Sequence, residues 1–433
     1  MVRSAVALLG VMVCGSAVAQ TLEVSPAKVL RDEQAVIRAT GLKPGTHVAL
    51  DADLVDGDTN TWTSHAEFVV DPTGVVDTSK QAPVNGSYKT VSAMGPIWSM
   101  RPGSGSHFID HYVATHGPQI VNFHLMVDGK EAATAELKQV NLGEGVQQVK
   151  LTGALHGFLY LPPGAEKHAA FIVLGGSEGG VPALMAAWLA NHGYVALALA
   201  YFHYEDLPAT MTNIPLEYFG SALAMLMNRP DVDKAKIGIV GASRGGELAL
   251  QLASMYQDVH AVVAFVPADI RFPSCCRTGP SPVRNIGTPQ SRFQPAWVFH
   301  GQVLPYFIGG QSAGPSVDRF AAMIHVEQIK GPILLVSGQD DMVWESHTMT
   351  NNIEQTLKTS HFKYPVVHLD YAHAGHHAGH PGFAPLWTGA ETKPTGGTIE
   401  DNAASIEDAT PKLLDFLAKA LPAGPAVTSS MGQ

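Results

Sequence analysis

The strongest indication of fold in this chain is the segment Ile237-Gly-Ile-Val-Gly-Ala-Ser-Arg-Gly-Gly-Glu-Leu-Ala-Leu250. Its apolar start is followed by Ser243 in a G-x-S-x-G frame and then by residues that favour a helix. This order predicts a nucleophile elbow, a sharp strand-to-helix turn that lifts the serine oxygen out of a sheet. Small neighbours let the backbone bend that tightly. Ser243 is therefore the candidate catalytic nucleophile, and the alternative is a serine that only caps the helix.

Two further predicted strands end in residues that could activate this serine. A serine hydroxyl needs a base to take its proton and a carboxylate to orient the base. Asp340 and Asp341 follow the apolar run that starts at Pro332, and His376 lies in the loop after a strand predicted over 364–369. The chain order Ser, Asp, His is that of α/β-hydrolases. Adjacent residues on an extended turn point in opposite directions, so only one of the two can reach the imidazole. We favour Asp341, three residues beyond Gly338, as the acid and Asp340 as its helix-capping or turn-forming neighbour.

The histidines of this loop offer a second reading, because their spacing would place them on one face of a helix and allow a metal site. They are His373, His376, His377 and His380. Glycine and proline between residues 375 and 382 argue against a regular helix there. We therefore expect a solvated loop with one catalytic base, His376, and we expect neither a metal nor another cofactor.

Residues 153–420 resemble the catalytic domain of the acyl-CoA thioesterases related to bile acid-CoA:amino acid N-acyltransferase. The matching stretches are LYLPPG at 159–164, GG-x-x-GG at 175–180, WLANHGYVALALAYF at 188–202, DLP at 206–208, PLEYF at 215–219, GASRGGELAL at 241–250, SGQDDMVW at 337–344 and YAHAGH at 371–376. The smaller front domain of the family matches TWTSHAEFVVDPTGVVD at 61–77 and GSYKTVSAMGPIWSM at 86–100. The resemblance covers nearly the whole chain in order.

The resemblance implies that Ser243 is the nucleophile, Asp341 the acid and His376 the base. Amidating members of the family use cysteine as the nucleophile, so a serine favours hydrolysis of an acyl thioester in fatty acid and acyl-CoA metabolism. The alternatives are an exported carboxylesterase or amidase, an acyl-CoA:amino acid N-acyltransferase, and a secreted binding protein whose triad is idle.

Acyl transfer also needs hydrogen-bond donors for the developing oxyanion. In α/β-hydrolases one donor is the backbone N–H after the nucleophile, here Arg244, and the second comes from a loop after an earlier strand. The run Phe171 to Leu174, followed by the glycine-rich loop, supplies Gly176 or Ser177. A phosphate cradle is the alternative, but the loop lacks the lysine of a P-loop.

The first 19 residues predict a cleavable signal peptide, because one positive charge precedes a short apolar run that ends in small residues. We therefore expect an exported protein, in the periplasm or outside the cell, with no stable membrane anchor. This expectation conflicts with an acyl-CoA substrate, which is an intracellular metabolite.

The composition indicates a folded, acidic protein with two cores. The chain has 433 residues, 45% of them hydrophobic, and a formal net charge of −11. An acidic chain is a poor nucleic-acid binder, so the expected partner is a small acyl thioester or ester. Phosphates of CoA would need a local basic exception, for which Arg244, Arg271 and Arg277 are candidates. Cys275 and Cys276 could form a vicinal disulfide or remain idle thiols.

Hydrophobic patterning divides the chain after the leader into three parts. Residues 20–148 alternate short apolar runs with turn signals, which predicts an immunoglobulin-like antiparallel β-sandwich. Residues 149–421 alternate strands with helices, which predicts the mainly parallel sheet of an α/β-hydrolase. Residues 422–433 form an expected flexible tail. The stretch 274–316 is rich in proline, glycine and aromatic residues, and we expect it to be a lid or a substrate wall. Its aromatic residues line an acyl pocket or simply pack: Trp297, Phe299, Tyr306 and Phe307.

Overall fold

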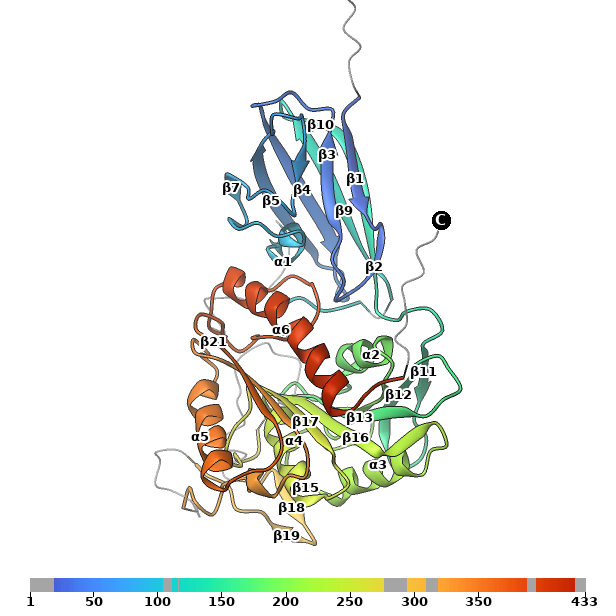
Figure 1. Cartoon of the computed structure of the whole chain (residues 1–433), viewed down its shortest axis with the longest axis vertical. Helices are drawn as coiled ribbons and strands as arrows, with labels where there is room; N and C mark the ends of the chain where they lie inside the picture. The colour runs from blue at the N-terminus through green and yellow to red at the C-terminus, as the bar shows by residue number, and fades with distance from the viewer. Residues whose placement is uncertain are drawn as a thin grey trace, which may run out of the picture.

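A computed structural model describes residues 19–103, 111–115, 117–275, 294–308, 318–387 and 395–424. Two β-sheets form a sandwich at one end of the molecule, and a larger sheet covered by helices forms the rest (Figure 1). The predicted fold class, an α/β-hydrolase preceded by a smaller antiparallel β-sandwich, is confirmed.

The sandwich consists of a three-stranded and a seven-stranded sheet. The first sheet contains, in spatial order, β1 (Thr21–Ser25), β3 (Val36–Thr40) and β6 (Val76–Asp77). The second contains β2 (Lys28–Leu30), β10 (Lys130–Val140), β9 (Gln119–Val127), β4 (His47–Val55), β5 (Thr61–Val69) and β7 (Asn85–Gly86), with β8 (Arg101–Pro102) also paired to β5. Along β4 every second residue is buried, which is the alternation expected of a strand with one face on a core. A short helix, α1 (Gly95–Trp98), closes one end.

The large sheet has eight strands. In spatial order they are β11 (Gln147–Lys150), β12 (His156–Leu161), β14 (Val195–Ala200), β13 (His168–Leu174), β16 (Val232–Ala242), β17 (Ala261–Phe265), β20 (Ile333–Gly338) and β21 (Val366–Tyr371). Neighbouring strands from β14 to β21 are parallel, and β12 pairs antiparallel with both neighbours. The carboxyl ends of β16, β17, β20 and β21 therefore meet at one edge of the sheet.

Helices cover both faces of this sheet. They are α2 (Ala183–Asn191), α3 (Glu217–Met227), α4 (Arg244–Met255), α5 (Ser346–Thr359), α6 (Ile399–Ala420) and the 3-10 turn η2 (Val326–Gln328). Apolar residues of α3, α4 and α5 share one core cluster, and those of α2 and α6 share another. Figure 1 shows α6 between the sheet and the sandwich. Parallel strands covered on both faces are apolar along their whole length, which is why β13 and β14 are continuously buried.

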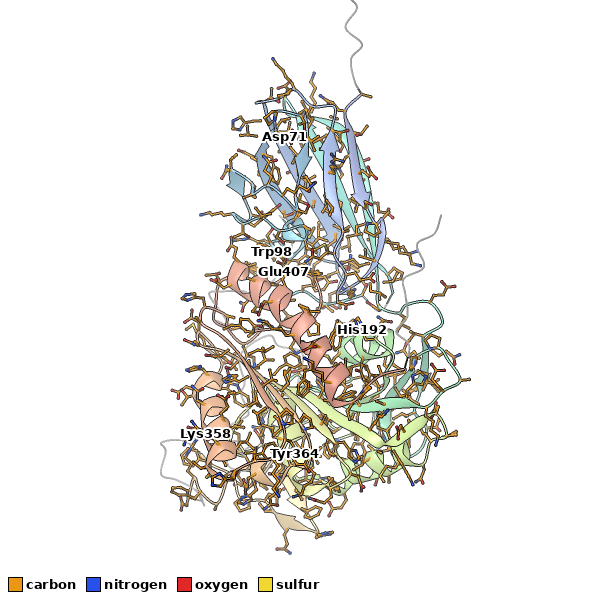
Figure 2. The ribbon with its side chains drawn as sticks, viewed as in Figure 1. Asp71, Trp98, His192, Lys358, Tyr364 and Glu407 are labelled. Atoms are coloured by element: carbon orange, nitrogen blue, oxygen red, sulfur yellow. The ribbon has the colours of Figure 1, made fainter. Side chains whose placement is uncertain are left out.

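The two parts of the chain pack closely. Asp32 of the sandwich accepts hydrogen bonds from the indole N–H of Trp188 (2.8 Å) and from His192 (2.7 Å), both at α2. Ser92 donates to Glu407 of α6 at 2.8 Å. Figure 2 shows Trp98, Glu407 and His192 at this junction. These hydrogen bonds of Asp32 and Ser92, which we call the polar frame, therefore hold α2 and α6 against the sandwich.

The expected lid is only partly described. Residues 294–308 contain β18 (Trp297–Phe299) and β19 (Gln302–Val303), which form a small sheet with β15 (Ile214–Pro215). Trp297 is buried in the main core, so packing describes it better than an acyl pocket does. Residues 276–293 and 309–317 lie outside the described residues, as do Cys276, Arg277, the leader up to residue 18 and the tail from 425. Cys275 is disulfide-bonded.

Candidate active site

Ser243 lies between the end of β16 and the start of α4, in the backbone conformation of a nucleophile elbow. Its φ is 56° and its ψ is −121°, a strained region for a residue with a side chain. The Ser243 N–H donates to the carbonyl of Phe265 at 2.9 Å, and its own carbonyl accepts from Glu247 N–H at 3.0 Å. These two bonds hold the turn in place, so Ser243 has the conformation that the G-x-S-x-G frame predicts.

The glycines of this frame are required by close packing. A Cβ atom on Gly241 would overlap the carbonyl of Gly245, and one on Gly245 would overlap the carbonyls of Leu174 and Gly175. The end of β16, the first turn of α4 and the loop after β13 therefore meet with no room for side chains. This contact brings the glycine-rich loop next to the elbow.

His376 and Asp341 form a close pair. Nδ1 of His376 is 2.8 Å from Oδ2 of Asp341, whose side chain is only 1% exposed. Oδ2 also accepts a hydrogen bond from the Ser346 hydroxyl at 2.6 Å, and Oδ1 accepts from the backbone N–H groups of Val343 and Trp344. The carboxylate is thus fixed from several sides. The contribution of Ser346 was not predicted, although it begins the helix directly after the Asp341 turn.

Aromatic contacts connect this pair to the elbow. The indole N–H of Trp344 donates to the carbonyl of Val266 at 3.0 Å, next to the Phe265 carbonyl that holds Ser243. The Trp344 ring meets the His376 ring edge-on, with centroids 6.0 Å apart. Trp344 also stacks on Phe272 at 5.4 Å, which gives the site an apolar wall. The three residues predicted for catalysis therefore lie at the same edge of the sheet.

A segment before α6 holds the aspartate and histidine loops together. Gly396 forms an isolated bridge with Asp341, and Gly397 forms one with Ala374. The His376 N–H donates to the carbonyl of Thr395 at 2.7 Å. Asn402 of α6 accepts from Gly375 N–H at 2.8 Å and donates to the Gly396 carbonyl at 3.2 Å. The relative position of His376 and Asp341 thus depends on residues that follow both in the chain.

The residues predicted to stabilise an oxyanion differ in their placement. Gly176 lies against the elbow, since a Cβ atom on it would be 3.3 Å from Cβ of Ser243. Its N–H donates to Oε1 of Glu178 at 2.8 Å. Arg244 is the first residue of α4, which places its N–H directly after the nucleophile. Ser177 is exposed. Gly176 is therefore placed beside the elbow, close to Ser243.

The expected solvated histidine loop is wrong in one respect, because two of its rings are packed against the protein. His380 lies against the ring of Phe265 with centroids 4.7 Å apart. Nε2 of His377 is buried without a hydrogen-bond partner in the described structure. Desolvation lowers the pKa of both imidazoles to about 4, so both are neutral near pH 7. Polar side chains of a loop can be buried by packing, and the spacing of the histidines in the sequence does not predict this burial.

Two of the arginines suggested for CoA phosphates are structural. Arg244 pairs with Glu247, Nε to Oε2 at 3.1 Å, and Glu247 is completely buried. Desolvation raises the pKa of that carboxyl, and the Trp297 indole N–H donates to it at 2.8 Å. Arg271 donates to Gln251 and to the carbonyls of Pro305, Ala321 and Met323. Their guanidinium groups are therefore occupied within the core.

A second serine–histidine–carboxylate chain lies elsewhere in the sheet. The Ser337 hydroxyl is 2.7 Å from Nε2 of His368, whose Nδ1 is 2.9 Å from Oε2 of Glu354. Ser337 is completely buried in β20, and its hydroxyl donates to Asp370 at 2.6 Å. These three side chains have the residue types of a catalytic triad, but the buried Ser337 hydroxyl is inaccessible to a substrate.

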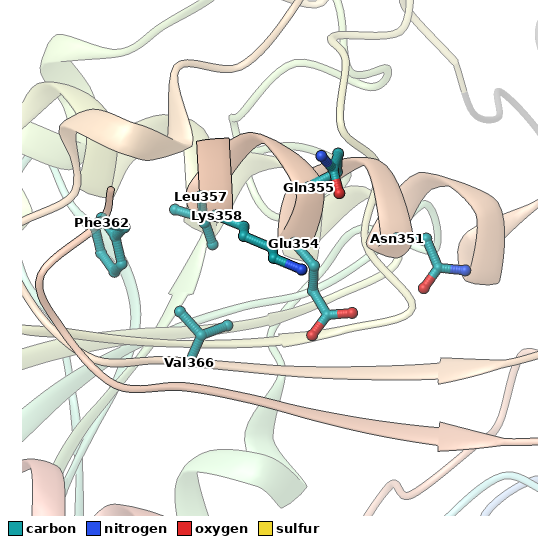
Figure 3. A pocket seen from close by; sticks show the side chains of 7 residues that line it. All are labelled: Asn351, Glu354, Gln355, Leu357, Lys358, Phe362 and Val366. Atoms are coloured by element: carbon teal, nitrogen blue, oxygen red, sulfur yellow. The ribbon is translucent and has the colours of Figure 1, made fainter. Parts of the chain in front are cut away.

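The described cavities do not coincide with the elbow. One of about 470 Å³ lies between α5 and the start of β21, and Figure 3 shows Glu354 and Lys358 among its polar lining residues. It contains no serine or cysteine. A smaller one, about 90 Å³, lies between Arg31 of the sandwich and Trp188 of α2.

Among the described residues, one group of side chains has the spacing of potential metal ligands. It consists of His156, Glu205 and Asp206, which are remote in sequence from the histidine loop.

Both parts of the chain match models of known protein families. Residues 214–423 match the family model described as "BAAT / Acyl-CoA thioester hydrolase C terminal". Residues 32–153 match the one described as "Acyl-CoA thioester hydrolase/BAAT N-terminal region". The two matches follow each other in the same order as the two parts of the structure.

Curated relatives are similar along most of their length. Mouse acyl-coenzyme A amino acid N-acyltransferase 1 is 28% identical over 92% of this chain and 97% of its own. Mouse peroxisomal succinyl-coenzyme A thioesterase is 28% identical over 93% of this chain and 97% of its own. Human acyl-coenzyme A thioesterase 2, mitochondrial, is 28% identical over 84% of this chain and 76% of its own. These relatives include both hydrolases and a transferase.

The names of these relatives contradict the predicted export. One thioesterase is peroxisomal and another is mitochondrial, which are intracellular compartments. The prediction of an exported protein is therefore wrong. Within the described ranges, no helix has the length and apolar character needed to cross a bilayer.

Proposed function

Because this chain belongs to the family of acyl-CoA thioester hydrolases and bile acid-CoA:amino acid N-acyltransferases, we propose that it hydrolyses acyl-CoA thioesters through an acyl-enzyme on Ser243. Family membership makes the chain an enzyme that acts on thioesters, either as a hydrolase or as an acyltransferase. The roles of individual residues are the part that we propose.

In this mechanism Asp341 holds the imidazole of His376 in the useful tautomer. Its carboxylate accepts Nδ1–H at 2.8 Å, which leaves Nε2 to accept the proton of the Ser243 hydroxyl. The serine oxygen attacks the thioester carbonyl, and the backbone N–H groups of Arg244 and Gly176 stabilise the oxyanion. The C–S bond then breaks, and His376 returns the proton to the CoA sulfur.

The second half of the reaction removes the acyl group. His376 takes a proton from a water molecule, whose oxygen attacks the ester carbonyl of the acyl-enzyme, and then returns a proton to Ser243. The products are a carboxylic acid and free enzyme. The serine nucleophile supports water as the acceptor, whereas transfer to an amine remains the second candidate function, favoured by the N-acyltransferase among the relatives.

The observation that carries the proposal is the fixed His376–Asp341 pair at the same sheet edge as a strained elbow serine. Each part has a structural alternative, since elbows can cap helices and such pairs can stabilise loops. The serine and the pair follow the carboxyl ends of β16, β20 and β21, at one edge of the sheet, and this common location supports the proposed triad. Residues 20–148 and 149–421 are the proposed domains, with the second carrying these groups.

The test is CoA release from a panel of acyl-CoAs by the full chain and by Ser243→Ala. We expect the variant to lose at least about 10³-fold in kcat while remaining folded, because the oxyanion site alone retains little catalysis. Ser221→Ala is the matched control, since this exposed serine bonds only its own helix. Full CoA release by Ser243→Ala would contradict the proposal. N-acyl products formed from added glycine in preference to acid would replace hydrolysis by transfer.

A further inference from the structure

A carboxylate occupies the backbone donor that acyl transfer requires. Oε1 of Glu178 accepts a hydrogen bond from the Gly176 N–H at 2.8 Å. A Cβ atom on Gly176 would lie 2.8 Å from Oε2 of Glu178 and 3.3 Å from Cβ of Ser243. The carboxylate and the serine therefore border the same face of Gly176. An oxyanion held by this donor needs the same distance of about 2.7–3.1 Å, so the glutamate oxygen stands where that oxygen would be.

The position of Glu178 is set by the backbone of its loop. The Tyr201 hydroxyl donates to the carbonyl of Gly175 at 2.7 Å, and the Gly180 N–H donates to the carbonyl of Phe202 at 3.0 Å. The ring of His203 lies 3.2 Å, through Nδ1, from the carbonyl of Glu178 itself. The loop is thus attached at both ends and in the middle to the segment after β14. Its one charged side chain is directed at the site by a fixed backbone.

Glu178 has no other evident role. Its side chain is exposed, and no lysine or arginine of the described residues is paired with it. An exposed carboxylate has no need of a backbone donor for its own solvation. When a thioester carbonyl takes the Gly176 N–H, the carboxylate must move aside, yet it stays within a few ångströms of the growing oxyanion. Two negative charges at that distance repel each other. A neutral acyl group supplies no positive charge to compensate this repulsion, so its reaction is disfavoured.

We propose that Glu178 is a specificity-determining residue that selects a primary ammonium group next to the reacting carbonyl. An ammonium there gives the displaced carboxylate a partner and compensates its charge. The group can belong to the acyl part of the thioester. It can also belong to an amine that binds as its ammonium, loses that proton to His376, and regains positive charge on nitrogen as it attacks the acyl carbon in place of water. The inference rests on the proposed function, because it assigns a substrate class to the site of Ser243.

The test compares two acyl-CoAs of equal shape and different charge. β-Alanyl-CoA carries an ammonium where butyryl-CoA carries a methyl group, and Glu178→Gln keeps the shape of the side chain without its charge. We expect the variant to raise kcat/KM for butyryl-CoA and to lower it for β-alanyl-CoA, each by about threefold or more, as for partly exposed ion pairs. Glu166→Gln, an exposed carboxylate outside the loop, should change neither.

The acceptor is examined with butyryl-CoA and added glycine. If the ammonium belongs to the acceptor, Glu178→Gln should lower the ratio of N-butyrylglycine to butyrate while butyryl-CoA is consumed at least as fast. A change in neither substrate preference nor product ratio would overturn the inference. So would a parallel loss with both acyl-CoAs, because a purely structural role of Glu178 in the loop predicts that result.

Failure of the proposed function would look different. If Ser243→Ala releases CoA from both substrates as fast as the unaltered protein, the site is not the one that acts. If Ser243→Ala is inactive and Glu178→Gln shows no change in preference, the hydrolase proposal stands and only the role of Glu178 is wrong.

Discussion

At the scale of single residues, the two adjacent aspartates show what sequence can and cannot distinguish. Both follow β20, and the sequence alone allows either of them to be the partner of His376. In the structure Asp341 has a nearly inaccessible side chain and contacts His376, whereas Asp340 is exposed and its backbone N–H donates to Ala374. Alternation of side-chain direction in the turn explains why only one of them reaches the imidazole.

This difference predicts unequal effects of two matched substitutions. Asp341→Asn should lower kcat by about 10³–10⁴-fold, because an amide N–H in place of the carboxylate stabilises the wrong tautomer of His376. Asp340→Asn should stay within about threefold of the unaltered protein, since its side chain is exposed. Steady-state CoA release measures both. Equal losses in the two variants would remove Asp341 from its proposed role.

The residues that sequence did not identify are those whose role comes from a contact. Glu178 and Ser346 each touch a predicted site residue, and neither belongs to a spacing rule. Glu178 did leave a signal, because it is the one charged residue within a loop of glycines and a serine. A charged side chain in a glycine-rich loop beside the proposed nucleophile indicates a functional role that spacing rules do not identify.

At the scale of elements, the strands and helices around the elbow were predictable because each is apolar along its length or along one face. β16 contains the apolar start of the stretch 237–250, and β21 overlaps the strand predicted over 364–369. α4 begins at Arg244, directly after Ser243, so the helix-favouring residues of that stretch are helical as predicted. The hairpin of β18 and β19 was missed, since three- and two-residue strands carry no periodic pattern.

Close packing at the elbow predicts the effect of one added methyl group. Gly245→Ala would force Cβ into the carbonyls of Leu174 and Gly175, so we expect a loss of about 1–3 kcal/mol in the free energy of unfolding. Activity should fall further, because relief of the overlap moves the loop that carries Gly176. Chemical denaturation and CoA release measure the two effects.

Gly117→Ala is the control for this substitution, since its added Cβ meets no atom within 4 Å. If Gly245→Ala and Gly117→Ala behaved alike, the elbow would tolerate side chains and the explanation of its glycines would be incorrect.

At the scale of the whole molecule, the sandwich and the sheet behave as one packed body in the structure. Residues of the 383–387 segment and of α6 enter the apolar core of the sandwich. Periodicity in the sequence predicts the strand pattern of the sandwich and the strand–helix pattern of the hydrolase part, but not the contact between the two parts. Phe383 and Ala403, for example, lie within residues 149–421 and pack in the core of the sandwich. The domain boundaries themselves stay predictions.

The buried carboxylate at this junction makes the packing testable. Asp32→Ala removes the acceptor of Trp188 and His192 and leaves a buried indole N–H without a partner. We expect the free energy of unfolding to fall by about 1–3 kcal/mol. Asp58→Ala, an exposed position in the sandwich, serves as the control and should be neutral. Identical unfolding curves for the two variants would mean that the polar frame does not stabilise the junction.

The segment 395–397 and Asn402 give this molecule a particular order of assembly. They bridge the loops of Asp341 and His376, and they come after both in the chain. A ribosome therefore releases the proposed nucleophile, acid and base before it releases the residues that align the last two. We expect the nascent chain to gain activity only when α6 emerges, so that an unfinished copy of this enzyme cannot consume thioesters.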